Sequence, residues 1–457
     1  MAETELKRTA SLAGAIAITV GSVIGMSIFV LINSMASLTG PSLPLAFFFA
    51  LVVASLNAVT VSQLSSAIPR SGGGYVLTSR ILGPFWGVAT SWFICLAILG
   101  ALCTVGLGIA KYINLYINPP ANEMLITIIL VGILILINAI GLFFAEVVQI
   151  IIVVLKVLAL LMFAVWGYFW GPKAADLATI PFLAGGIGGL ALCSVLCYYS
   201  YIGFTVIAEV GEEMSNAKRN IPLSVGISAV IIFVVYFSVA ITFNRIMGYN
   251  PSMLKALGAP LAFAGGLFLP PLAIHFLNLG ALGAGVTALN AGIMAMPREI
   301  FAQGRDQMVP SVFRYLTKKH RTPLWSVLVV FPLFVALLLF NQSLDWYGFL
   351  AVGALLLTNL TIAVACLLLP KRFPERYENA PFKIGKKWLT FFSWAAIVTA
   401  VVFLAFIVLQ LPKLPLLLAL WAAVVIVYYF ARKWWMLRRG VDFAGIFKTI
   451  PGFEEKK

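Results

Sequence analysis

Residues 21 to 29 read Gly21-Ser22-Val23-Ile24-Gly25-Met26-Ser27-Ile28-Phe29, inside the first long apolar stretch of the chain. Glycine costs roughly 1 kcal/mol against alanine within a helix, and serine offers the backbone competing hydrogen bonds, so a helix is expected to break here. Lipid cannot satisfy the backbone groups of such a break, which survives only in a polar cavity or inside protein. We therefore predict half of a small-molecule binding site. The alternative is close packing of two helices through their small residues.

The composition is typical of a polytopic membrane protein. Of 457 residues, 62% are hydrophobic and only 10% are charged, and the mean hydropathy is +1.03. A spanning helix needs roughly 20 apolar residues, and such runs recur along nearly the whole chain. We predict twelve transmembrane helices, near residues 11–38, 42–67, 84–112, 122–142, 145–170, 188–213, 220–247, 272–303, 323–341, 344–369, 388–410 and 413–436.

Lysine and arginine are distributed unevenly around these segments. An even number of segments puts both termini on one side, and most of the 31 basic residues lie in the termini and the even-numbered loops. The opposite side holds only Lys111, Lys173, Arg245, Lys255 and Lys413. The positive-inside rule therefore predicts that both termini are cytoplasmic. Basic loops that face anionic membrane lipids explain the net charge of +15 without a nucleic acid partner.

The residues indicate no metal or nucleotide site. With two histidines in the chain no metal-ligand set is evident, and packing is the interpretation that we favour for Cys95, Cys103, Cys193, Cys197 and Cys366. The glycines at 72–74 are not followed by the Gly-Lys-Ser/Thr of a phosphate-binding loop. We predict a flexible turn there, which re-enters the membrane.

Lys156 is the only basic residue deep within a predicted membrane segment. An ionisable side chain at that depth is costly and is a functional candidate by default. The alternative is a structural lysine that pairs with backbone carbonyls or reaches the interface. About ten apolar residues on either side make the interface hard to reach.

A second polar interruption, Tyr-Tyr-Ser-Tyr-Ile-Gly-Phe-Thr at 198–205, lies in the sixth predicted segment. Interruptions in segments one and six are what an inverted repeat of five plus five helices gives, and in such folds the substrate binds where the broken helices meet. A half-helix N-terminus suits a carboxylate, and unwound carbonyls suit an amine. A site with both is complementary to a zwitterion, so amino acids are the leading substrate class.

These residues resemble the amino acid-polyamine-organocation (APC) superfamily of transporters, over nearly the whole chain. Gly-x-x-Ile-Gly-x-x-Ile-Phe matches 21–29, and Pro-x-x-Gly-Gly-x-Tyr resembles 69–75. The family's Gly-Phe with Glu-Glu-x-x-Asn-Pro-x-Arg-x-Ile-Pro downstream is similar to 203–222, with Ala217 where proline is usual. Its segment-eight motif looks like Arg298, Arg305, Asp306 and Pro310. For Arg298 and Arg305, solvated charges at the cytoplasmic end and a gating role are both open.

The resemblance implies an all-α polytopic membrane protein of the leucine-transporter type, a 5+5 inverted repeat whose helices 1 and 6 are discontinuous. The transporter domain would be single and cover 1–436, with repeats at about 11–170 and 188–369 and two more helices within 388–436. Residues 437–457 would form a cytoplasmic tail. The expected location is the plasma membrane.

The resemblance also implies, by position, a set of substrate-binding residues. Amides at the first break would bind the carboxylate, and carbonyls at Tyr199, Ser200 and Ile202 would bind the amine. Tyr199 would cover the substrate. The full set is Gly25, Met26, Ser27, Tyr199, Ser200, Ile202, Phe204 and Thr205.

This chain departs from the family's pattern at residues that are expected to determine substrate specificity. Met26 and Ser27 follow Gly25 where Gly-Ser-Gly or Gly-x-Gly is common, and Thr205 stands where selectors of cations often place an acid. Apolar lining favours a neutral amino acid. Glu209 stands where a neutral residue is usual, so an amine or polyamine transporter is an alternative. Further candidates for selectivity are Trp92, Cys95 and Asn290.

Lys156 resembles the segment-five lysine of proton-coupled and exchanging members, located where sodium-coupled relatives bind sodium. Because Thr287 on segment eight lacks a convincing hydroxyl partner, we expect a proton-coupled transporter or an exchanger with no cofactor; a sodium-coupled transporter is an alternative.

No nucleophile with a base and no catalytic domain appears, which disfavours an enzyme. A nutrient sensor on the same fold is disfavoured too, and nothing requires an oligomer or indicates a partner subunit.

Overall fold

The computed structural model describes residues 12–68, 72–141, 146–174, 179–205, 217–317 and 322–448. Within these ranges the regular elements are helices, and no strand occurs. Nine helical stretches there are long and apolar enough to cross a membrane, and three shorter apolar ones accompany them, Thr19–Val30, Gly186–Tyr199 and Leu324–Leu338. The chain is therefore an all-helical, multi-pass membrane protein.

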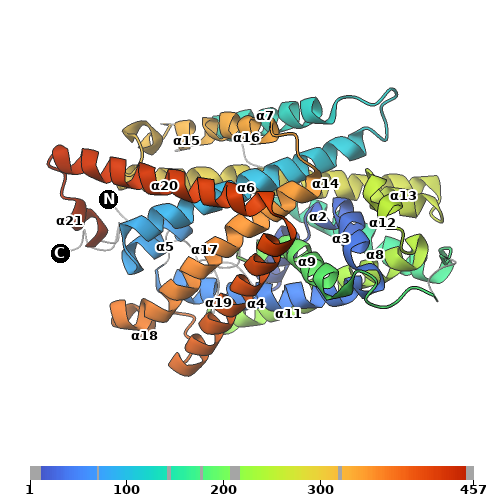
Figure 1. Ribbon diagram of the computed structural model, residues 1–457, viewed down its shortest axis with the longest axis horizontal. Coiled ribbons are helices and arrows are strands. Elements are labelled where there is room, and N and C mark those ends of the chain that lie inside the picture. Colours follow the sequence, from blue (N-terminus) through green and yellow to red (C-terminus); the bar gives the residue numbers. More distant parts are fainter. Residues whose placement is uncertain are drawn as a thin grey trace.

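The long helices lie mostly along one axis of the molecule (Figure 1). Their bounds agree with the corresponding predicted segments to within a few residues. They are α4 (Leu43–Ala67), α6 (Pro84–Ile113), α7 (Glu123–Ile140), α8 (Glu146–Trp170), α11 (Ala217–Met247), α14 (Pro271–Arg305), α17 (Leu344–Arg372), α19 (Lys386–Gln410) and α20 (Lys413–Arg438).

Three predicted segments are interrupted in the structure. The first becomes α1 (Leu12–Val23), α2 (Ser27–Val30) and α3 (Ile32–Thr39). The sixth contains α9 (Gly186–Tyr199) and the 3-10 helix η2 (Ile202–Thr205), and the ninth is α15 (Leu324–Leu328) and α16 (Val330–Leu338). The interruptions in the first and sixth segments fall where the glycines and serines predict them.

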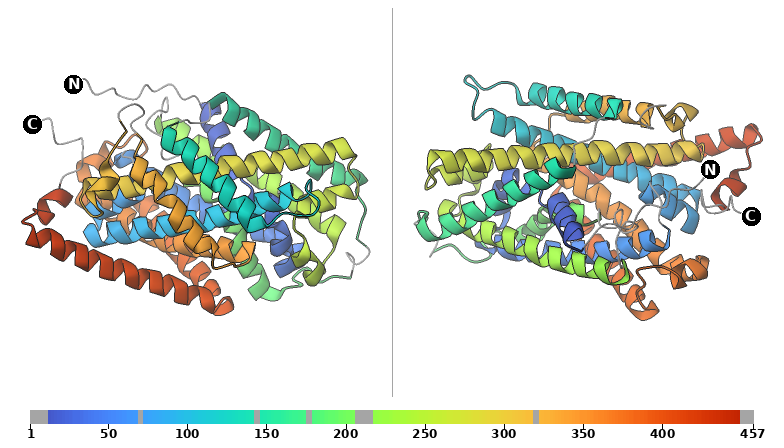
Figure 2. Two further views of the ribbon diagram at one scale, coloured as in Figure 1. Left: turned by 90° about the horizontal axis from the view of Figure 1, so that it is seen from above. Right: turned by 180° about the vertical axis from the view of Figure 1, so that it is seen from behind.

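Shorter elements gather at the two ends of the molecule. One end carries α5 (Gly73–Ile81), α18 (Pro374–Glu378) and α21 (Phe443–Lys448), and the other carries α12 (Pro251–Ala256) and α13 (Pro260–Gly266) (Figure 1). We call them the α5 end and the α12 end. Figure 2 shows α14, in yellow, running from one end to the other. Two further 3-10 helices are η1 (Gly40–Ser42) and η3 (Ser311–Arg314).

The prediction of a flexible turn at 72–74 is wrong from Gly73 onward. Gly72 has a φ of 78°, which glycine adopts easily, and α5 starts at the next residue. The α5 side chains are largely buried, with Arg80 only 7% exposed. This helix depends on contacts with α14, more than 200 residues away in the sequence, so the local pattern does not reveal it.

Candidate functional site

The first predicted interruption is a true break in the hydrogen-bond ladder. A continuous helix would direct the Gly25 amide to the Gly21 carbonyl. Instead, the Gly25 amide donates to the Val23 carbonyl at 2.8 Å. The Gly21 carbonyl has therefore lost its helical partner. Among the described residues, the amides of Met26 and Ser27 have no backbone acceptor, and they point out of the start of α2.

Lys156, on α8, takes the place of the missing amide. Its Nζ atom donates to the Gly21 carbonyl oxygen at 2.6 Å, and the side chain is 1% exposed. A cation at the C-terminal end of a helix interacts favourably with the helix dipole, so the amine holds the broken end of α1 against α8. In the described part of the chain no carboxylate pairs with Lys156. A structural lysine would make the same contact, and transport measurements separate the two roles.

The second interruption tightens the end of α9. The amides of Ser200 and Tyr201 donate to the carbonyls three residues earlier, those of Cys197 and Tyr198. The chain then continues as η2, where the Phe204 ring stacks on Tyr201 with ring centroids 6.0 Å apart. The Ser200 hydroxyl is buried and has no hydrogen-bond partner among the described residues. Buried polar groups without a partner are uncommon in native proteins.

The two breaks meet backbone to backbone. A Cβ atom on Gly203 would lie 2.3 Å from the Ser22 carbonyl oxygen and 2.6 Å from the Val23 nitrogen. Only glycine permits such an approach. The prediction that these two stretches lie together is therefore supported by geometry, and the alternative of mere helix packing does not account for the broken ladder.

Tyr236, on α11, links the two breaks and was not predicted. Its hydroxyl lies 3.0 Å from the Val23 carbonyl oxygen and 3.1 Å from the Ser200 carbonyl oxygen. The hydroxyl proton is thus shared between two carbonyl oxygens, one from each broken helix. In the sequence Tyr236 stands in an ordinary apolar run, Val234-Val235-Tyr236-Phe237, which carries no signal of this role.

The predicted substrate-binding residues lie around this meeting point. Met26, Ser27, Tyr199, Ser200 and Phe204 are buried, whereas Gly25 and Ile202 are half-buried. The Tyr199 hydroxyl donates to a carbonyl of α6, that of Ala101, at 3.4 Å. Thr205 closes η2, and nothing is described of its side chain; Glu209 lies outside the described residues.

The three further candidates for selectivity contact other elements. Along α6, Cys95 and Trp92 lie about 9 Å and about 14 Å from Ala101 toward the α5 end, at 1.5 Å per residue. The Trp92 indole donates to Gln303 at 3.1 Å. Asn290 accepts a hydrogen bond from Asn138 of α7 at 2.8 Å. The hydrogen bonds of Trp92 and Asn290 therefore go to residues outside the two breaks.

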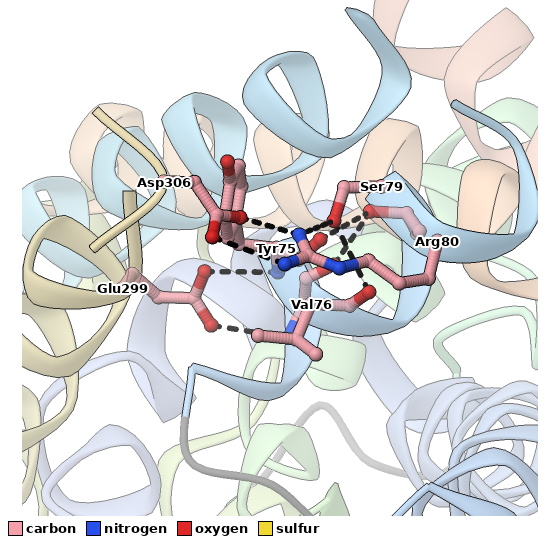
Figure 3. A network of polar contacts seen from close by, with 8 residues as sticks. Tyr75, Val76, Ser79, Arg80, Glu299 and Asp306 are labelled. Carbon is pink, nitrogen blue, oxygen red and sulfur yellow. Dashed lines mark hydrogen bonds and ion pairs between the residues drawn. The ribbon is translucent and has the colours of Figure 1, made fainter. Parts of the chain in front are cut away.

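A buried polar cluster joins α5 to the C-terminal end of α14. The Glu299 carboxylate, from α14, accepts hydrogen bonds from the Gly74 and Tyr75 amides, both at 3.1 Å, and so caps α5. The Asp306 carboxylate forms a two-pronged ion pair with Arg80. Figure 3 shows both carboxylates pointing from α14 to α5. We call these five residues the α5–α14 latch.

The latch extends to α6 through Gln303. Its amide group donates to Ser91 at 2.9 Å and accepts from Trp92. Glu299, Gln303 and Asp306 are spaced by four and three residues, so they occupy one face of α14. That spacing is the sequence signal that could have revealed the latch.

Replacing Asp306 by asparagine is expected to destabilise the protein by about 3–5 kcal/mol, because it leaves the Arg80 charge buried without its partner. Thermal unfolding in detergent would register this as a lower Tm. The control is Lys383→Gln, which removes an ion pair to Glu378 whose two side chains are 36% and 51% exposed. Exposed pairs contribute little. Equal Tm values for the two variants would contradict the role of the latch.

The α12 end contains a cavity. A cavity of about 460 Å³ opens between α3, α6, α7 and α17, and Val30 and Tyr347 are among its lining residues. Val30 ends α2, whose other end is the first break. Two facing breaks in a multi-pass helical protein, with a cavity beside one of them, are the arrangement of a membrane carrier for a small molecule.

The comparisons agree with this class. The amino acid permease family matches residues 11–430, and the chain belongs to that family. It is therefore a member of the APC superfamily of transporters and not an enzyme, as the sequence motifs predicted.

Named relatives differ in what they carry. A vacuolar cationic amino acid transporter of Arabidopsis thaliana is 28% identical over 84% of this chain and 66% of its own length. A branched-chain amino acid permease of Bacillus subtilis is 25% identical over 82% of this chain and 83% of its own. A methylthioribose transporter of Bacillus subtilis is 26% identical over 87% and 93%. The chain spans slightly under two thirds of the length of the Arabidopsis relative.

Proposed function

We propose that the protein is a secondary active transporter that binds a neutral, zwitterionic amino acid between the two breaks and moves it by alternating access. The observation that carries the proposal is the meeting of the breaks around Gly203 and Tyr236. The substrate carboxylate binds the free amides of Met26 and Ser27 at the start of α2, where the helix dipole is positive. The amine binds near the Ser200 carbonyl and hydroxyl.

The overall architecture in this proposal is twelve membrane crossings in a 5+5 inverted repeat. Nine long apolar stretches and three short ones support the number of crossings. The α5 end faces the cytoplasm of the cell, and the membrane is the plasma membrane. Basic residues of the predicted inner loops and tail at this end, such as Arg372, Arg438 and Arg439, support that orientation.

A neutral substrate is proposed because the described part of the breaks carries no carboxylate that would attract a second positive charge. Met26, Ile202 and Phe204 are apolar and suit an aliphatic side chain. The relatives are named for cationic amino acids, branched-chain amino acids and methylthioribose, so family membership by itself selects none of these substrates.

Proton coupling or exchange is proposed in place of sodium coupling. The Lys156 amine already occupies the free Gly21 carbonyl. The Thr287 hydroxyl, which a sodium site on α14 would need, donates to its own helix at the Gly283 and Ala284 carbonyls, both at 3.0 Å. A buried amine that gains and loses a proton is a physically reasonable coupling group.

Uptake of a panel of labelled amino acids into proteoliposomes tests this function. We expect saturable uptake of at least one neutral amino acid, and accumulation when the medium on the α12 side is made acidic. A panel in which only amines or polyamines are taken up would support the alternative substrate class. Uptake that requires sodium and ignores the pH gradient would contradict the coupling proposal, and uptake of nothing would contradict the function itself.

Replacing Tyr236 by phenylalanine is expected to lower uptake at low substrate concentration about tenfold. The change removes the donor to the buried Ser200 carbonyl, at a cost of about 1–3 kcal/mol, and it removes the hydroxyl that joins this carbonyl to that of Val23, so the two breaks loosen. The control is Tyr428→Phe, which removes a hydroxyl that donates to the Met308 carbonyl at 2.8 Å, far from the breaks. Similar uptake by the two variants would show that Tyr236 does not organise the site.

A further inference from the structure

Charged side chains of both signs surround the cavity at the α12 end. Lys111 and Lys255 bring two ammonium groups, and Glu123 and Asp345 bring two carboxylates. Formal charges therefore cancel around a volume of about 460 Å³, which lies within the range of about 300–1,000 Å³ typical of small-molecule sites. Balanced charges give no net electrostatic attraction to a cation or an anion. A zwitterion, in contrast, can pair its carboxylate with the ammonium groups and its ammonium group with the carboxylates.

These charges are available to a ligand. The Lys111 Nζ and Glu123 Oε2 atoms are 3.5 Å apart, longer than the roughly 2.7–2.9 Å of a tight charged hydrogen bond. In the part of the chain that the structure describes, neither Lys255 nor Asp345 forms an ion pair. A ligand can therefore bind them without breaking a strong contact.

Asn33 positions the chain beside the same cavity, of which it is a lining residue. Its side-chain nitrogen donates to the Leu254 and Leu257 carbonyls, both at 3.0 Å. These bonds hold α3 against the end of α12, the helix that carries Lys255, and so fix that side of the cavity.

We propose that this cavity is a second binding site for the zwitterionic amino acid, which holds the substrate before it reaches the breaks. The proposal rests on the proposed function. The carboxylate binds Lys111 and Lys255, and the ammonium group binds Glu123 and Asp345. Val30 lines the cavity and is three residues from Ser27, so the two sites follow one another along α2.

Alkylation of a single introduced cysteine tests the site. The native cysteines are buried, so Ser34→Cys, at the cavity, provides an accessible thiol in the purified full-length protein. The probe is a small cationic maleimide, which alkylates thiols, and the protectant is the amino acid with the highest uptake in the panel. At about ten times the dissociation constant, the free fraction and hence the alkylation rate fall about tenfold. Ser252→Cys, exposed on α12, is the control thiol and should not be protected.

Charge variants then identify the bound groups. On the Ser34→Cys background, Lys111→Gln with Lys255→Gln should abolish protection. Lys173→Gln with Lys413→Gln removes two cations outside the cavity and should leave protection intact. Gly25→Leu fills the space between the breaks and should also retain protection; if it does not fold, the charge variants decide.

Two results would overturn the second site. One is an alkylation rate of the Ser34→Cys variant that no transported amino acid lowers. The other is equal protection in the two charge-variant pairs. Absence of uptake for the whole panel is a different failure, because it contradicts the proposed transport function. The second site is then tested by whether any amino acid of the panel protects the Ser34→Cys thiol.

Discussion

Replacing Lys156 by alanine should abolish accumulation of the amino acid under a pH gradient. The accumulated amount should be at least tenfold lower than with the native protein. The change removes the amine that occupies the Gly21 carbonyl and with it the buried group proposed to carry the proton. Two effects combine, since a buried carbonyl is left unpaired at about 1–3 kcal/mol and the coupling group is lost. Proteoliposome uptake with an imposed pH gradient measures the result.

Lys156→Gln separates coupling from structure. Glutamine can still donate a hydrogen bond to the Gly21 carbonyl, but it cannot gain or lose the proton. If Lys156 carries the proton, Lys156→Gln keeps exchange of labelled for unlabelled substrate and loses gradient-driven accumulation. A purely structural lysine predicts that Lys156→Gln accumulates substrate as well as the native protein does, and that outcome would contradict the coupling proposal. Thr287→Val is the control, because its hydroxyl bonds only within α14.

Replacing Gly203 by alanine should nearly eliminate transport and lower the Tm by several degrees. The new methyl group would lie 2.3 Å from the Ser22 oxygen and 2.4 Å from the Ser22 carbon. Both are backbone atoms, so α1 has to shift as a whole. Overpacking of this kind costs about 1–3 kcal/mol, and here it displaces one break from the other.

The matched control is Gly226→Ala in α11. A Cβ atom there meets nothing within 4 Å, so alanine should stabilise the helix slightly or leave it unchanged. Thermal unfolding and uptake are measured for both variants. If Gly203→Ala matched Gly226→Ala in Tm and uptake, the close approach of the two breaks would not be needed for function.

The breaks were predictable because their cause is local. Glycine and serine weaken a helix wherever they stand, and an apolar run of membrane length makes the weakness visible. Lys156 was predictable for the same reason, as one charge among apolar neighbours. Its partner was not, because the Gly21 carbonyl becomes free only when the Gly25 amide turns to Val23.

Tyr236 could not be derived from the local pattern, and of the latch only the spacing of Glu299, Gln303 and Asp306 is visible in the sequence. Tyr236 acts through backbone carbonyls of two other helices, and backbone groups leave no mark in a sequence. Glu299 caps α5 from 225 residues away. Trp92 and Asn290 are candidates by residue type and by segment alone. Only the fold shows that the Trp92 indole contacts Gln303 and that Asn290 contacts Asn138 of α7.

The site between the breaks is tested most directly by competition between the transported amino acid and two of its analogues. One analogue is the amide, which lacks the carboxylate, and the other is the deaminated acid, which lacks the amine. Each should compete for uptake at least about tenfold more weakly than the amino acid, since a hydrogen bond to a charged group contributes about 1.5–3 kcal/mol. An analogue that competes as well as the amino acid itself would show that the breaks do not bind the group that it lacks.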